Sequence, residues 1–164
     1  MIRVIFAVET HMGYSNKGTM PDWKSTADFK HFKESTEGQI VVMGSKTWED
    51  PMMKRPLPNR INCVVSTRDD LINADKINHL ISSQDLVSQM RLLERTYPNK
   101  DIVIIGGWNI ISQCLPVIEK VTLTVMYEKY ETDKRLPLGW LIGYGLGKTF
   151  KLSDGKGKVV EYIK

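Results

Sequence analysis

The sequence predicts an α/β fold in which a mostly parallel central sheet carries an antiparallel C-terminal hairpin strand and is flanked by four helices. Two observations lead to this prediction. Short apolar runs, each of the length of a buried strand, alternate with segments of helical periodicity. The last stretch, TFKLSDGKGKVVEYIK, has strand-like segments on both sides of Asp154-Gly155, a typical hairpin turn.

Each expected element follows from its own pattern along the chain. Residues 9–24, with Gly13, Gly18 and Pro21, read as a long loop, and RPLPNR at 55–60 reads as a turn stiffened by proline. Strands are expected over 2–8, 40–43, 61–66, 77–81, 101–105 and 121–127. Helices are expected over 25–36, over 45–49, over 83–94 from a serine cap, and from the end of Gly106-Gly107 to Leu115.

The composition suits one globular domain over residues 1–164. Hydrophobic residues make up 41% and charged residues 26% of the 164 residues, which argues against disorder. The net charge of +4 favours anionic partners, but the lysines and arginines are scattered rather than gathered in a nucleic-acid-binding block. The N-terminal apolar run is too short for a signal peptide, and no run could span a membrane, so a cytoplasmic protein is expected.

Cysteine and histidine spacing gives no metal site. Cys63 and Cys114 lie far apart in apolar runs and are interpreted as buried, reduced thiols. The three histidines are isolated, without the spacing of metal ligands, and are interpreted as surface residues. No bound metal is therefore expected.

Two junctions of strand, glycine and helix, at Gly44 and at Gly106-Gly107, point to a dinucleotide. Each places backbone N–H groups at a helix start beyond the carboxyl end of a strand, where open α/β sheets bind phosphates. The sequence contains no G-x-G-x-x-G after its first strand, no P-loop and no G-x-S-x-G elbow. Packing alone also explains such junctions, so this signal leaves the ligand open.

Asp28 has two interpretations. Trp23, Phe29 and Phe32 are close in sequence or one turn away, and a carboxylate among aromatic rings is partly desolvated and can bind an amidine-like heterocycle. Ser25 stands three residues before Asp28, which is also the spacing of a helix-capping arrangement. From this segment alone, capping is the stronger interpretation.

The order of several motifs changes that balance. They are VIFAV, TMPDW, ADFKHFKEST, IVVMGSKTWED, RPLPNR, NCVVST, IVIIGG, CLP and LTV. In this order, from residue 1 to about 137, the chain resembles the dihydrofolate reductase family. The resemblance implies that family's single-domain fold, with NADPH as cofactor. It also implies reduction of 7,8-dihydrofolate to tetrahydrofolate, by hydride transfer to pterin C6 and protonation at N5, which supplies one-carbon carriers for thymidylate and purine synthesis.

The resemblance assigns the substrate side. Asp28 would hold the pterin's 2-amino group and adjacent ring nitrogen, with support from Thr124, and Arg60 would hold the glutamate carboxylate. Met20 and Trp23, in a mobile lid over 13–23, would close on the two rings, which makes Asp28, Met20, Trp23 and Thr124 the expected catalytic residues. The expected substrate-binding residues are Ile5, Ala7, Asp28, Phe29, Phe32, Met52 (or Met53 nearby), Leu57, Arg60, Ile105 and Thr124.

The resemblance also assigns the cofactor side. Ser66, Thr67 and Arg68 sit where the family binds the adenosine 2′-phosphate, and the Gly106-Gly107 bond is expected to be cis. Ser45 and Asn109 replace common arginines, so Lys46 and Arg68 would supply the positive charge. The expected cofactor-binding residues are Ala7, Gly13, Met20, Gly44, Ser45, Lys46, Thr47, Ser66, Thr67, Arg68, Ile105, Gly106, Gly107, Trp108, Asn109 and Ile110.

Two alternatives remain beside this expectation. One is a reductase of the same fold that acts on another heterocycle, such as a pyrimidine intermediate of flavin synthesis. The other is a non-catalytic relative that keeps the nucleotide site. The expected partners are dihydrofolate and antifolate inhibitors, with no nucleic acid and no membrane, and a monomer is expected.

Overall fold

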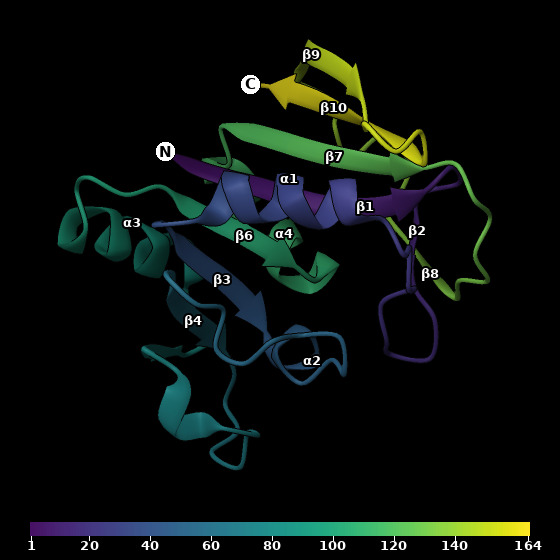
Figure 1. Ribbon diagram of the computed structural model, residues 1–164. Coiled ribbons are helices and arrows are strands. Elements are labelled where there is room, and N and C mark those ends of the chain that lie inside the picture. The colour runs from purple at the N-terminus through teal and green to yellow at the C-terminus, as the bar shows by residue number, and fades with distance from the viewer.

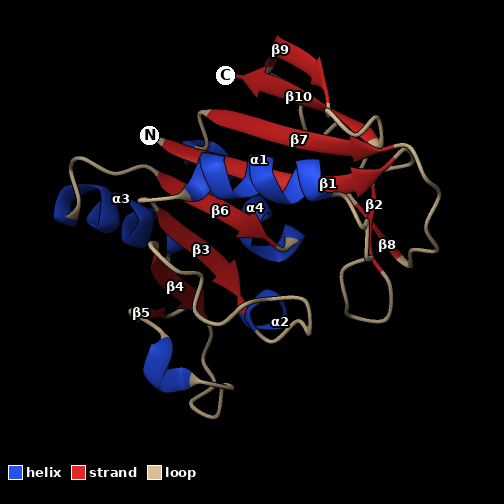
Figure 2. Cartoon of the chain, viewed as in Figure 1, coloured by secondary structure: helices blue, strands red, loops and turns tan.

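The computed structural model describes residues 1–164, and an eight-stranded sheet forms its centre (Figures 1 and 2). The strand order is β5-β4-β3-β6-β1-β7-β10-β9. All neighbours from β5 to β7 are parallel, whereas β10 runs antiparallel to β7 and β9, so the predicted sheet is confirmed. The strands are β1 (Ile2–Glu9), β3 (Ile40–Gly44), β4 (Ile61–Val65), β5 (His79–Ile81), β6 (Ile102–Gly106), β7 (Lys120–Met126), β9 (Gly145–Lys151) and β10 (Gly157–Ile163).

Four α-helices flank the sheet, as the sequence predicts, with α1 crossing the near face in Figure 1 and α4 behind it. Short 3-10 turns occupy Ala74–Lys76 and Leu115–Val117. The helices are α1 (Thr26–Thr36), α2 (Ser45–Trp48), α3 (Leu86–Thr96) and α4 (Trp108–Cys114).

The predicted start of α3 at a serine cap is wrong. The helix begins at Leu86, and the side chain of Asp85 accepts the capping hydrogen bond from the backbone N–H of Ser88. The backbone carbonyls of Ser82 and Gln84 are instead bound by the side chain of Gln89, which folds this segment into a turn ahead of the helix. An aspartate at the cap position competes well with a serine two residues earlier, because both are strong acceptors.

Both faces of the sheet are buried, which explains the unbroken apolar runs of its central strands. In β3, Ile40 and Val42 pack in the core cluster that also contains residues of α3 and α4. Val41 and Met43 point to the opposite face and pack with Trp48 of α2. Alternate residues of one strand therefore build two separate cores, and α1 and α2 cover the second of them beside the site described below.

A second, two-stranded sheet lies in the segment expected to be a loop. Here β2 (Gly13–Ser15) pairs antiparallel with β8 (Lys134–Arg135). Beyond β2 the chain folds back at Lys17 and Gly18, which both have positive φ angles. The loop prediction missed this pairing because its two strands are short and about 120 residues apart.

The sulfur chemistry agrees with the expectation of reduced thiols. Cys63 and Cys114 are free and buried, and burial raises the pKa of Cys63 to about 12 and that of Cys114 to about 11. No group of three or more His, Cys, Asp or Glu side chains is arranged to hold a metal ion. None of the helices is both long and apolar enough to traverse a lipid bilayer.

Candidate functional site

A cavity of about 560 Å³ opens toward the carboxyl ends of the central parallel strands. Its walls include Ala7 of β1, Gly44 at the end of β3, Ile105 of β6 and Thr124 of β7. In the strand order, β1 lies between β6 and β7. Open α/β sheets bind their ligands at this edge.

Most of the predicted site residues line this one cavity. Those brought together are Ile5, Ala7, Met20, Asp28, Phe29, Phe32, Gly44, Ser45, Lys46, Thr47, Met52, Leu57, Ile105, Gly107, Trp108, Asn109, Ile110 and Thr124. The predicted substrate residues are mainly apolar and come from β1, α1 and the turn after α2, whereas the predicted cofactor residues gather at the two glycine junctions. A largely apolar cavity with few polar groups is typical of a small-molecule site.

Asp28 is a strongly perturbed acid in the wall of this cavity. Its side chain lies in the first turn of α1, and the residue is only 9% exposed. Burial raises the pKa of Asp28 to about 6; hydrogen bonding by Thr124 acts in the opposite direction, and the charge of Asp154 adds to the rise. A titratable group whose pKa is shifted in this way, inside an apolar pocket, is typical of a functional site.

Ser25 confirms the capping interpretation of the Asp28 segment. Its hydroxyl oxygen accepts a hydrogen bond from the backbone N–H of Asp28 at 3.0 Å, which caps α1. The same hydroxyl donates to the carboxylate of Asp154, at the tip of the β9–β10 hairpin, at 2.6 Å. Because the cap uses the backbone of Asp28, the carboxylate of Asp28 remains directed to the cavity.

Two predicted lid residues do not line the cavity. Trp23 is 1% exposed and packs behind Ala7 and Ala27, in the cluster that contains Met126. Gly13 lies in β2, where a Cβ atom would come within 2.0 Å of the hydroxyl oxygen of Thr132. Neither residue of this pair reaches the cavity surface, because Trp23 packs in a buried cluster and Gly13 packs against the loop before β8.

The predicted anion-binding residues also lie outside the lining. Arg60 donates to the hydroxyl of Thr36 and to the carbonyl of Pro58. Ser66, Thr67 and Arg68 follow β4 on the exposed surface. Arg68 is held by two carboxylates, those of Glu49 and Asp70, at 2.7 and 3.0 Å. Both arginines are thus oriented by other protein groups and do not line the cavity.

The second glycine junction has the close geometry that the sequence predicts. Gly106 and Gly107 are joined by a cis peptide bond, and Gly106 has a φ angle of +142°. A Cβ atom at Gly106 would lie 3.1 Å from the ring of Phe6 and 3.2 Å from the hydroxyl of Thr47, whereas one at Gly107 would meet no protein atom within 4 Å. Gly107 lines the cavity, so its backbone faces open space into which a ligand can fit.

Comparisons with known proteins agree with this geometry. The sequence model of the dihydrofolate reductase family matches residues 1–140. The chain belongs to this family. The dihydrofolate reductase of Lactococcus lactis is 34% identical over 130 residues, which cover 79% of this chain and 74% of that protein. The bifunctional dihydrofolate reductase-thymidylate synthase of Daucus carota is 31% identical over 83% of this chain, which spans only 28% of that longer protein.

A solved structure of the family has the same fold. The dihydrofolate reductase from Enterococcus faecalis, complexed with NADP(H) and RAB-propyl, superposes with a TM-score of 0.78 over 99% of this chain and 95% of that one. The two sequences are 24% identical, so the likeness speaks for the fold.

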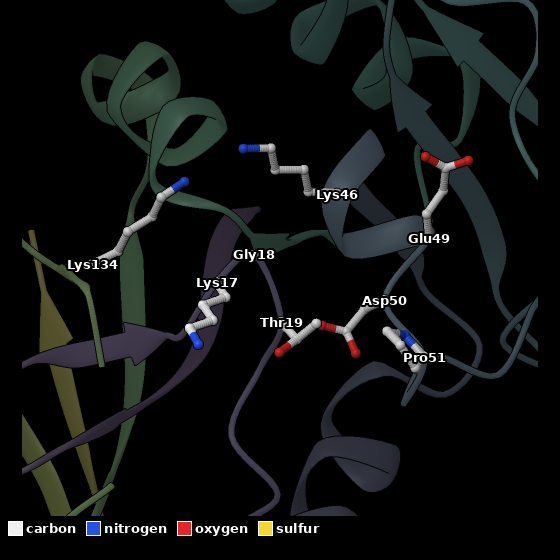
Figure 3. A pocket seen from close by; sticks show the side chains of 8 residues that line it. All are labelled: Lys17, Gly18, Thr19, Lys46, Glu49, Asp50, Pro51 and Lys134. Carbon is white, nitrogen blue, oxygen red and sulfur yellow. The ribbon is translucent and has the colours of Figure 1, made fainter. Parts of the chain in front are cut away.

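Several cavity residues escaped the sequence analysis. Tyr14, Ser15 and Lys134 reach the wall from the β2–β8 sheet, and Asp50 comes from the turn after α2. An adjoining depression of about 470 Å³ separates the lid from α2 (Figure 3). It is lined by Lys17, Gly18, Thr19, Lys46, Glu49, Asp50, Pro51 and Lys134. No local pattern in the sequence predicts these contacts, because they depend on the pairing of segments that are far apart in the chain.

Asn62 is a second residue that the sequence did not reveal. It is 1% exposed, and its amide binds the carbonyls of Leu57 and Arg60 and the backbone N–H of Leu57, at 3.0 to 3.1 Å. One buried side chain thereby fixes the shape of the turn that carries two predicted substrate residues. Buried amides with satisfied donors and acceptors often specify a backbone conformation in this way.

Replacing Asn62 with alanine is expected to lower the free energy of unfolding by about 2–4 kcal/mol, because two buried backbone groups and one part-buried one lose their partner. The variant should also bind dihydrofolate more weakly, since Leu57 and Arg60 lose their fixed positions. Urea unfolding and a dihydrofolate titration measure the two effects. Asn99→Ala, at an exposed position, is the control; equal stability of the two variants would contradict the role of Asn62.

Proposed function

We propose that this chain is a single-domain dihydrofolate reductase that uses NADPH to reduce 7,8-dihydrofolate to 5,6,7,8-tetrahydrofolate. The observation that carries the proposal is the buried carboxylate of Asp28 in an apolar cavity at the carboxyl edge of the sheet, in a chain that belongs to this family. A buried anion in that position favours positive charge on a bound heterocycle, and a ring activated in this way accepts hydride more readily.

The substrate side of the cavity supports this reaction. The carboxylate of Asp28 would accept hydrogen bonds from the 2-amino group and the adjacent nitrogen of the pterin, with Thr124 beside it. Ile5, Ala7 and Phe32 would enclose the ring. Phe29, Met52 and Leu57 would flank the aminobenzoyl group, and Arg60, already directed by Thr36, would hold the glutamate carboxylate at the margin.

The cofactor side fits a dinucleotide at the glycine junctions. The open space in front of Gly107 leaves room for a ligand to approach the backbone, and Gly44, Ser45 and Thr47 form the facing wall. NADPH would supply the hydride. Around it, Lys46 would attract the phosphates, and Met20 would cover the reacting rings and exclude water. Trp23 would act from below, by packing behind Ala7, instead of closing over the rings.

The deciding experiment is a turnover assay on the purified protein that follows NADPH absorbance. Dihydrofolate and a pyrimidine intermediate of flavin synthesis serve as parallel substrates, and tetrahydrofolate is identified by chromatography. Consumption of NADPH with dihydrofolate alone supports the proposal. Turnover of the pyrimidine alone indicates the related reductase, and no turnover with either indicates a non-catalytic relative.

Arg68→Ala is expected to raise the KM for NADPH about tenfold and to leave the KM for NADH unchanged, because a charge-assisted contact with the 2′-phosphate is lost. Ser66 and Thr67 beside it would supply hydroxyl donors to the same phosphate. Arg91 is also exposed and paired with a glutamate, but it lies on α3 away from the cavity, so Arg91→Ala is the control. Equal changes in both KM values for Arg68→Ala would argue against a 2′-phosphate site here.

The proposal extends to the setting of the enzyme. It would act in the cytoplasm as a monomer on small molecules, without nucleic acid or membrane as a partner, and antifolate inhibitors would compete with dihydrofolate for the cavity. The scattered distribution of basic residues supports the absence of a nucleic-acid partner. Gel filtration at micromolar concentration tests the monomer.

A further inference from the structure

Asp50 is a second buried carboxylate in the cavity wall, and the reaction proposed above does not use it. It lies two residues beyond the end of α2 and is 8% exposed. One oxygen of its carboxylate accepts a hydrogen bond from the backbone N–H of Met20 at 2.8 Å, and the other accepts from the backbone N–H of Met52 at 2.9 Å. The side chain thus joins the lid, residues 13–23, to the opposite wall of the cavity.

The other hydrogen bonds of the lid stay on its own side. The N–H of Gly13 donates to Glu9 in β1, and the N–H of Lys17 donates to Asp133 just before β8. The pairing of β2 with β8 also holds the lid on the β1 and β8 side. Across the cavity, toward α2, the bond from Met20 to Asp50 is the only hydrogen bond that the lid makes. The position of the lid over the cavity therefore depends on one carboxylate.

We propose that Asp50 is a positioning residue that holds the lid closed over the cavity through the backbone of Met20, an inference that rests on the proposed function. A carboxylate that accepts from a backbone N–H makes a charge-assisted hydrogen bond, and burial strengthens it. Asp50, from the segment after α2, and Thr19, from the lid, both line the depression and lie next to one another in the view of Figure 3. Release of this bond frees the tip of the lid from the α2 wall, while β2 stays paired with β8.

The number of donors and acceptors at Asp50 suggests a substitution that should remove one of its two hydrogen bonds and keep the other. Two N–H groups point at two carboxylate oxygens, and an asparagine has only one oxygen to offer. In Asp50→Asn the amide NH₂ must face one of the two N–H groups. The bond to Met52 closes a local turn two residues long, whereas the bond to Met20 spans 30 residues and is lost when the lid moves. The variant should therefore keep the turn and release the lid.

Limited trypsin digestion of the whole protein tests this release without an activity assay. Lys17, at the lid tip, reports lid opening, and Lys148, in β9 at the far edge of the sheet, reports opening of the fold. Asp50→Asn should raise the ratio of cleavage after Lys17 to cleavage after Lys148 about tenfold, the effect of losing one hydrogen bond to a charged group. General destabilisation raises both cleavage rates together and leaves the ratio unchanged.

The matched control is Asp22→Asn. Asp22 lies in the same lid, is exposed, and accepts a hydrogen bond only from the N–H of Lys24, so its cleavage ratio should equal that of the unaltered protein. An unchanged ratio in Asp50→Asn overturns the assignment of Asp50.

Ligand affinity completes the test. In the complex with oxidised cofactor, Asp50→Asn should raise the Kd for dihydrofolate about tenfold, because an open lid weakens binding. Steady-state kcat should change less, because an open lid also speeds product release. A raised cleavage ratio with unchanged affinity would also overturn the inference. If the unaltered protein does not reduce dihydrofolate, the proposed function fails, but the cleavage ratio still decides whether Asp50 holds the lid.

Discussion

Replacing Asp28 with asparagine is expected to slow hydride transfer to dihydrofolate by about 10²- to 10³-fold near neutral pH, the size of effect seen when one preorganised electrostatic group is removed. The neutral amide keeps the shape of the side chain but no longer favours positive charge on the bound ring. Single-turnover mixing of the NADPH complex with dihydrofolate measures this step directly, apart from product release.

The pH profile adds a second readout to this variant. Burial raises the pKa of Asp28 to about 6, so kcat/KM of the unaltered enzyme should show a titration step near pH 6 that Asp28→Asn lacks. Glu34→Gln is the control, because Glu34 is an exposed carboxylate on the same helix. A single-turnover rate within about threefold of the unaltered enzyme would contradict the central role of Asp28.

The same substitution is expected to stabilise the folded protein. The folded-state pKa of Asp28, about 6, lies above its ordinary value of 3.8, so the folded protein binds the proton more tightly than the unfolded chain does. Between about pH 4 and pH 6, folding stability is therefore lost as the pH rises, and above pH 6 the whole penalty is present. At about 1.4 kcal/mol for each pKa unit, Asp28→Asn should be more stable by up to about 3 kcal/mol at pH 8.

Urea unfolding at a series of pH values between 4 and 8 measures this difference. A carboxylate away from Asp28, such as Asp101, has a lowered pKa and contributes the opposite slope, but it does so in both proteins and cancels in the comparison. The gain from Asp28→Asn should vanish near pH 4. A gain that is independent of pH, or a loss of stability at pH 8, would show that the carboxylate is not desolvated in solution. A more stable but less active variant is the expected signature of a functional acid.

The sheet and the four helices were predictable because each depends on local residues. The runs around Val42 and Ile104 are apolar at every position, as a strand buried on both faces requires, and Gly44 marks the end of its strand. The glycine junctions were found in the same way, since each lies at the boundary of a regular element. Asp28 was assigned to the site through the family resemblance, because its local segment favours a capping role.

What could not be predicted depends on contacts between distant segments. Nothing near Gly13 or Trp23 in the sequence shows that Thr132 packs against the first or that Val159 buries the second. Asp50 could pass for a residue of a surface turn until Met20, 30 residues earlier, is seen to donate to it. The position of the lid is therefore determined by tertiary contacts, whereas the outline of the cavity is determined by the strand order.

The hydrogen bond between Ser25 and Asp154 joins the C-terminal hairpin to the start of α1, beside Asp28, although the family match ends at residue 140. In β10, Val159 lies opposite Thr124, the neighbour of Asp28, so the hairpin covers the open border of β7. A chain that ends at the last matched residue would expose that border of β7 to solvent. Ser25, which caps α1, would also lose the carboxylate of Asp154 that accepts its hydroxyl hydrogen bond. We therefore expect a chain that ends at residue 140 to lose activity, although it contains the whole region that the family model matches.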